Sequence, residues 1–225
     1  QYAVLIGSAI EIPLLLYILH QRAKHFSENR ARLRAMDGTD PLTGLTVTTV
    51  LHLRLRDTIR RARRYRQHSG LLLVDLSNHA DIALRAGRET ADRALVVAAA
   101  RLTRVVREVD TVCRIADRRF AVLIEGPIES AQIKLLAQHL VAKGLEQAST
   151  LPEDLSLRFR LVSILLPSEQ SDGAEEDERA EVRRTLERMN EALDQLADDP
   201  RKVVVHLPQL SAPALATSAT PPAAV

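Results

Sequence analysis

Two adjacent arginines stand where the sequence predicts a tight turn. The stretch CRIADRRFAVLIEG, residues 113–126, is typical of a strand, a turn at residues 116–119 and a second, apolar strand. The turn contains Arg118 and Arg119. A guanidinium group is permanently charged, donates hydrogen bonds, and can neither ligate a metal ion nor accept a proton near neutral pH. This pair therefore predicts ionic contacts, either with carboxylates of the same fold or with a phosphate group.

The elements that would position this turn alternate along the chain. Helices are predicted at residues 47–67, 88–109, 129–143 and 181–196, and strands at 71–76, 112–115, 120–124, 157–166 and 202–206. An acidic loop is predicted at 168–178. Strands interleaved with amphipathic helices indicate an α/β fold in which helices cover both faces of a central mixed sheet.

Composition excludes several classes of function. The 225 residues carry 31 Lys and Arg against 29 Asp and Glu, a formal charge of +2, which gives no global reason to expect a nucleic-acid partner. Aromatic residues make up 3% and Trp is absent, so platforms for stacking single-stranded bases are not expected. The single cysteine, Cys113, excludes an internal disulfide and suits a reducing compartment.

The predicted helix at 47–67 is locally very basic. Its segment from Arg54 to Arg66 includes RLRDTIRRARRYR, which raises nucleic-acid and anionic-lipid binding as hypotheses. A solvated helix face near a membrane is the interpretation that we favour.

The N-terminal segment predicts a membrane anchor. The chain begins with Gln1, so we expect it to be a piece of a longer protein, and residues 2–19 are almost uniformly apolar. This length favours a transmembrane helix at 1–20 over a buried helix or a signal peptide, although Glu11 interrupts it. The basic flank at 21–36 places that side in the cytoplasm by the positive-inside rule, so we expect the inner membrane with the folded domain facing the cytoplasm.

Three further segments follow the predicted span. Residues 21–36 are expected to form a signalling stalk helix, and residues 37–207 one globular domain. The Ala-, Pro-, Ser- and Thr-rich tail at 208–225 is expected to be disordered.

Four motifs, in order and spacing, resemble the GGDEF family of diguanylate cyclases. They are DPLTGL at 40–45, LLLVDLSNHADIALRAGRETADRAL at 71–95, CRIADRRFAVLIEG at 113–126 and FRLVSILL at 159–166. The similarity covers residues 37–206 and implies a nucleotidyl-cyclase-like sheet. The leading helix also resembles the last helix of the seven-transmembrane sensory modules that often precede this domain.

The resemblance implies a degenerate catalytic signature. Asp75 matches the family's metal-binding aspartate, but Arg118 and Arg119 replace the metal-binding and catalytic carboxylates. Ala116 and Asp117 replace the paired glycines that allow phosphate to approach the backbone. We expect no catalytic residues, no metal site beyond the remnant Asp75, and no cofactor. Because Asp tolerates a left-handed turn, the hairpin itself is expected to survive.

The family's guanine pocket also looks damaged. By position, Ala83 replaces the base-reading asparagine and Arg88 a histidine, whereas Asp92 matches the second guanine contact. Asp75 and Asp92 are therefore interpreted either as remnants of a nucleotide site or as acids that pair with Arg118 and Arg119.

The sequence Arg107-Glu108-Val109-Asp110 matches the family's inhibitory RxxD site, which binds cyclic di-GMP. A guanidinium fork suits guanine O6 and N7, and a carboxylate can accept from the guanine amino and imino groups. An i, i+3 surface ion pair on a helix is the alternative interpretation. Lys134 is a further candidate contact.

These expectations give one hypothesis and two alternatives. The chain is expected to be a catalytically inactive GGDEF-family membrane signalling protein that receives cyclic di-GMP through Arg107 and Asp110. One alternative is a dimerisation or interaction module that regulates a partner and binds no nucleotide. An active diguanylate cyclase is the other, and Arg118 and Arg119 argue against it.

Overall fold

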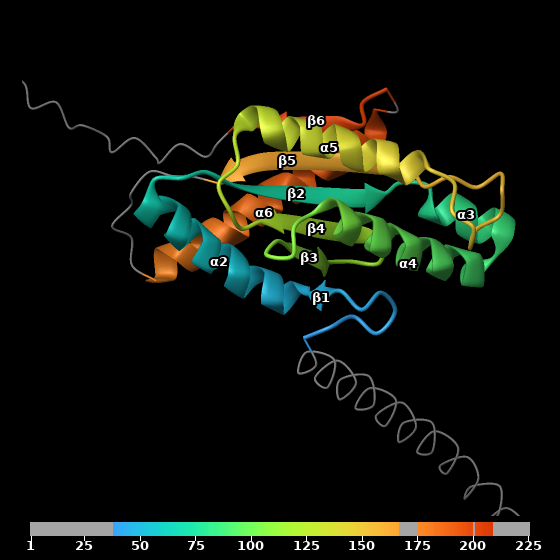
Figure 1. Cartoon of the computed structure of the whole chain (residues 1–225), viewed down its shortest axis with the longest axis horizontal. Helices are drawn as coiled ribbons and strands as arrows, with labels where there is room; N and C mark the ends of the chain where they lie inside the picture. The colour runs from blue at the N-terminus through green and yellow to red at the C-terminus, as the bar shows by residue number, and fades with distance from the viewer. Residues whose placement is uncertain (1–37, 167–174, 200, 209–225) are drawn as a thin grey trace, which may run out of the picture.

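The computed structural model describes residues 38–166, 175–199 and 201–208 (Figure 1). The predicted transmembrane helix, the stalk and the tail beyond Pro208 lie outside these ranges. Within the ranges, none of the helices combines the length and apolar character needed to cross a bilayer.

A mixed sheet forms the centre, as predicted, and within the described ranges it has six strands rather than the five expected, because the first strand, Thr46–Val47, was not predicted. The strands are β1 (Thr46–Val47), β2 (Ser69–Leu76), β3 (Thr111–Arg114), β4 (Arg119–Ile124), β5 (Phe159–Leu166) and β6 (Val204–Leu207). The helices are α2 (Thr48–Tyr65), α3 (His79–Ala86), α4 (Arg88–Val105), α5 (Ser130–Leu145) and α6 (Glu175–Asp198). The spatial order is β1-β3-β4-β2-β5-β6, with parallel pairing only between β1 and β3 and between β5 and β6.

Strand β2 is buried on both faces because helices cover both sides of the sheet. All eight of its residues are buried. Successive side chains of a strand point to opposite faces, so Leu72, Val74 and Leu76 enter one core while Leu71 and Leu73 enter the other. This is why β2 appears in the sequence as a continuous apolar run rather than an alternating one.

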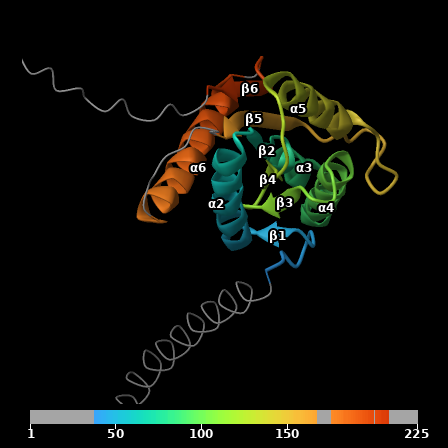
Figure 2. The same ribbon diagram turned by 60° about the vertical axis from the view of Figure 1, so that its left-hand side comes forward.

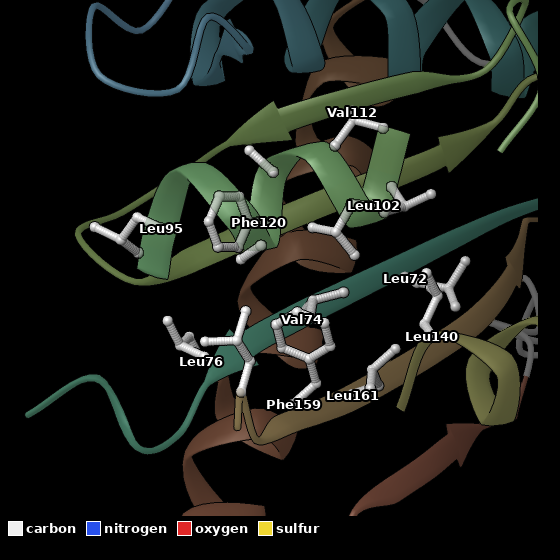
Figure 3. Packing of buried hydrophobic residues seen from close by; sticks show 14 of the residues in the cluster. Leu72, Val74, Leu76, Leu95, Leu102, Val112, Phe120, Leu140, Phe159 and Leu161 are labelled. Carbon is white, nitrogen blue, oxygen red and sulfur yellow. The ribbon is translucent and has the colours of Figure 1, made fainter. Parts of the chain in front are cut away.

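The first core lies between the sheet and helices α3, α4 and α5. Leu95 and Leu102 of α4 gather there with Phe120 of β4, and Phe159 of β5 lies near Val74 (Figure 3). Both phenylalanines are almost completely buried. The second core lies under α2 and α6, which together cover the opposite face (Figure 2).

The basic face of helix α2 is largely exposed, as predicted, and it also forms ion pairs with α6. Arg60 donates two hydrogen bonds to Glu178 of α6, at 3.2 and 2.6 Å, and Arg63 donates two to Glu181, at 2.8 and 2.6 Å. These two ion pairs, of which that of Arg60 is bidentate, link α2 to α6, and the apolar side of α2 packs on the sheet. Part of the basic charge is therefore paired within the domain, while the side chains of Arg54, Arg60 and Arg61 stay about half exposed.

Two predicted boundaries are wrong for identifiable reasons. Helix α4 ends at Val105 rather than 109, since the Asp110 carboxylate accepts a hydrogen bond from the backbone N–H of Arg107 and closes a turn there. Helix α6 begins at Glu175, inside the predicted acidic loop, because its glutamates find arginines on α2. Helix α3 was not predicted as a separate element.

Candidate functional site

The turn at 116–119 joins β3 to β4 and covers a buried carboxylate. Asp75, near the end of β2, has a side chain only 4% exposed. Arg118 donates from Nε to Asp75 Oδ1 at 2.9 Å, and Arg119 Nε lies 3.5 Å from the same oxygen. Of the two interpretations offered for Asp75, pairing with the arginines is the one that the structure shows.

The hairpin survives, but not through a left-handed aspartate. Among the described residues only Arg66 combines a side chain with a positive φ, so Asp117 does not adopt the left-handed conformation. The turn is closed instead by backbone hydrogen bonds between Ala116 and Arg119, and the Leu76 N–H donates to the Arg118 carbonyl at 3.0 Å.

The divalent metal that the resemblance implies does not fit these residues. The Arg118 guanidinium already supplies positive charge at Asp75, and a guanidinium cannot ligate a cation. Nor does the described part of the chain place three or more His, Cys, Asp or Glu side chains where they could share a metal ion. Asp75 is a counter-ion for arginine in this structure.

Two arginines make further contacts that hold the hairpin in place. Arg119 Nη1 donates to Asn190 Oδ1 at 3.2 Å, and Arg119 Nη2 donates to Asp194, so β4 is tied to α6. Arg114 Nη1 donates to both carboxylate oxygens of Asp40, at 3.2 and 3.0 Å, and Arg114 Nη2 donates to the Asp117 carbonyl at 2.7 Å. The DPLTGL turn and the hairpin are therefore one connected unit.

A cleft of about 650 Å³ opens beside the hairpin. It brings together the turn residues with Ala83, Arg88 and Asp92, the three positions that the resemblance assigns to the guanine pocket. Burial lowers the pKa of His79, which also lines the cleft, below its ordinary value. Two arginines that line the cleft already have ion-pair partners, because Arg114 and Arg119 bind carboxylates that lie outside the lining.

Arg107 and Asp110 meet at a second, smaller hollow of about 230 Å³. They lie in a turn after α4, not on a helix, and no ion pair between their side chains is found. Asp110 Oδ2 accepts from the Arg107 backbone N–H at 3.0 Å, and Oδ1 accepts from the Glu125 N–H at 3.2 Å. The carboxylate is thus fixed, whereas the Arg107 guanidinium makes no hydrogen bond to a described residue. Lys134 lines a different hollow.

Glu125 links this turn to helix α2. Its carboxylate accepts from Thr111 Oγ1 at 2.6 Å, from Arg54 at 2.9 Å and from Arg61 at 2.5 Å. Burial raises the pKa of Glu125, but the three hydrogen bonds outweigh it and hold the pKa below its ordinary value of 4.5. The charged form is therefore the one that the fold stabilises.

Replacing Glu125 with Gln should reduce the pH dependence of stability in acid. A carboxylate with a depressed folded pKa stabilises the fold above its unfolded pKa, and this contribution is lost as pH falls through the folded value. The wild-type free energy of unfolding should therefore fall below about pH 4.5, and that of Glu125→Gln should fall less. Urea titrations from pH 6 to pH 3 measure the difference, and parallel curves would contradict the expectation.

Sequence reasoning missed two polar residues that shape these sites. Glu125 follows directly after β4, and nothing in the sequence indicated that Thr111, Arg54 and Arg61 would meet there. Gln132 lines the Arg107 hollow. The signal that could have found Gln132 is its place three residues after Glu129, the spacing of a capping box.

Solved structures share this fold. The coiled coil and GGDEF domain of DgcB from Caulobacter crescentus, in complex with cyclic di-GMP, gives a TM-score of 0.63 at 15% identity, over 87% of this chain and 99% of that one. The GGDEF domain of TpbB from Pseudomonas aeruginosa gives a TM-score of 0.62 at 24% identity, over 76% and 93%. At such identities the likeness shows a GGDEF-like α/β fold.

Comparison with family models shows to which family the chain belongs. The family model described as diguanylate cyclase, GGDEF domain, matches residues 38–183. The chain belongs to the GGDEF family. It is 28% identical over 127 residues to the diguanylate cyclase TpbB of Pseudomonas aeruginosa, a match that covers 54% of this chain and 29% of TpbB. The match thus spans less than a third of that curated relative.

Proposed function

We propose that the chain is a catalytically inactive, membrane-anchored GGDEF protein that binds cyclic di-GMP through Arg107 and Asp110. The observation that carries the binding proposal is their meeting in one hollow. The Asp110 carboxylate is held by two backbone N–H groups, and each oxygen keeps a lone pair for the guanine amino and imino groups. The uncommitted Arg107 guanidinium can donate to guanine O6 and N7.

Catalytic inactivity is supported by the hairpin. The two arginines neutralise Asp75 from within the chain, at 2.9 and 3.5 Å, and leave no carboxylate pair to hold a divalent ion. Purified protein incubated with GTP and magnesium is expected to form no cyclic di-GMP. Detectable product would refute this part of the proposal.

The location of the domain follows from the segment at 1–20, which we propose as an inner-membrane anchor with residues 37–207 facing the cytoplasm. At the membrane, such a domain would act through a homodimer or through a partner signalling protein. The solved DgcB domain in complex with cyclic di-GMP and the diguanylate cyclase SiaD in complex with its activator SiaC are precedents within the fold.

Substitution of Arg107 tests the binding proposal. The full chain, purified in detergent, should bind cyclic di-GMP in isothermal titration calorimetry, and Arg107→Ala should weaken the affinity by at least tenfold because a charge-assisted donor pair is lost. Arg104→Ala, one turn earlier on α4, is the matched control and should bind as the wild type does. An absence of wild-type binding, or an unchanged Arg107→Ala, would refute the proposal.

A further inference from the structure

The hollow at Arg107 and Asp110 has a lining suited to a planar base with hydrogen-bonding groups at its edge. Most of the lining is apolar, and it consists of Val105, Val106, Ile124, Pro127, Ile128 and Leu136. Its polar side chains are those of Arg107, Asp110 and Gln132. A planar base buries its faces against apolar groups and exposes its hydrogen-bonding groups at the edge, so polar groups within such a lining decide which base is accepted.

Gln132 is held in a defined orientation by the start of α5. Its Oε1 accepts from the backbone N–H of Glu129 at 2.9 Å, while the Glu129 side chain accepts from the Gln132 backbone, which completes a capping box. Since Oε1 must face the Glu129 N–H, the NH₂ group takes the other position. That Nε2 group makes no hydrogen bond to a described residue, which leaves a fixed donor at the hollow.

We infer that Gln132 is a third ligand-contacting residue of this site, donating from Nε2 to an acceptor of the bound guanine nucleotide. The inference rests on the proposed function. Arg107, in the turn after α4, and Gln132, on α5, would then supply the donors. Asp110 would supply the acceptor. This set suits guanine, whose O6 and N7 accept and whose N1–H and N2–H donate. Adenine has an N–H donor at C6, where guanine has the O6 acceptor, so the same donors would face another donor.

Three variants separate a contact from a capping role. Gln132→Met keeps the side-chain length but removes the donor, so the affinity for cyclic di-GMP should fall about tenfold. Gln132→Glu keeps an acceptor for the Glu129 N–H but removes the donor and places a negative charge beside an anionic ligand, so it should weaken binding further. Glu129→Ala breaks the capping box from its other side, leaves the Gln132 amide intact, and should bind within about twofold of the wild type.

Calorimetry with cyclic di-GMP, accompanied by urea unfolding of each variant, gives outcomes that can be told apart. Wild-type binding that weakens in Arg107→Ala but is unchanged in Gln132→Met and Gln132→Glu would overturn the Gln132 inference alone. A loss in Glu129→Ala equal to that in Gln132→Met would show that Gln132 acts only as a cap. An absence of wild-type binding would overturn both this inference and the proposed function.

Discussion

Restoring carboxylates at the hairpin should make the stability of the domain depend on divalent metal. In Arg118→Glu/Arg119→Glu, two anions replace two cations beside Asp75, whose side chain is 4% exposed. Removing the partners of a buried charge costs about 3–5 kcal/mol, and like-charge repulsion adds to it. Carboxylates are also the hard oxygen ligands that magnesium and manganese prefer, so added metal should recover part of the lost stability.

Thermal unfolding of the full chain with and without magnesium measures this effect. The wild type should show the same midpoint in both conditions, because Arg118 already serves as the counter-ion of Asp75. The neutral double variant Arg118→Gln/Arg119→Gln is the control, and it should lose stability without recovering it when metal is added. A wild-type midpoint that rises with magnesium would contradict the assignment of Asp75 as a counter-ion for arginine.

Gly144→Ala should destabilise the fold, although Ala normally favours a helix by about 1 kcal/mol over Gly. A Cβ at this position of α5 would lie 2.7 Å from Phe159 Cδ2 and 2.9 Å from the Leu157 carbonyl oxygen. Phe159 is packed in the first core and the Leu157 oxygen belongs to the backbone, so neither can move aside easily. The clash should outweigh the helical gain and leave a net loss of about 2 kcal/mol.

Urea unfolding of Gly144→Ala and of Gln138→Ala shows whether the steric clash of the new Cβ or the higher helix propensity of Ala has the larger effect on stability. Gln138 is an exposed residue of the same helix, so its substitution should change the free energy of unfolding by less than about 0.5 kcal/mol. Stabilisation by Gly144→Ala would show that α5 moves away from β5 at little cost.

The order and type of most elements could be predicted because each one leaves a local pattern. The apolar run of β2 and the alternation of strands and helices were sufficient for the mixed sheet. Boundaries that depend on distant partners were not predictable. The start of α6 depends on arginines 118 positions away in sequence, and the end of α4 depends on the hydrogen bond that the Arg107 backbone N–H donates to the Asp110 carboxylate.

The residues of the site were predicted, but only some of their contacts were. Asp75 was named together with Arg118 and Arg119, and the structure brings the three together. Arg107 and Asp110 were placed near the end of a helix, whereas they lie in a turn after it, where the Asp110 carboxylate accepts from the backbone N–H groups of Arg107 and Glu125. Spacing along the chain carries no information on Glu125, because the arginines that bind it come from another element, whereas Gln132 stands at capping-box spacing from Glu129.

Glu125 contacts two elements of the fold, one through its backbone and the other through its side chain. Its backbone N–H donates to Asp110 in the Arg107 turn, and its carboxylate binds Arg54 and Arg61 on α2. A displacement of the turn that pulls on this N–H also moves the acceptor of both arginines, with no intervening side chain to absorb it. A movement at the hollow is therefore coupled to helix α2 through this single residue.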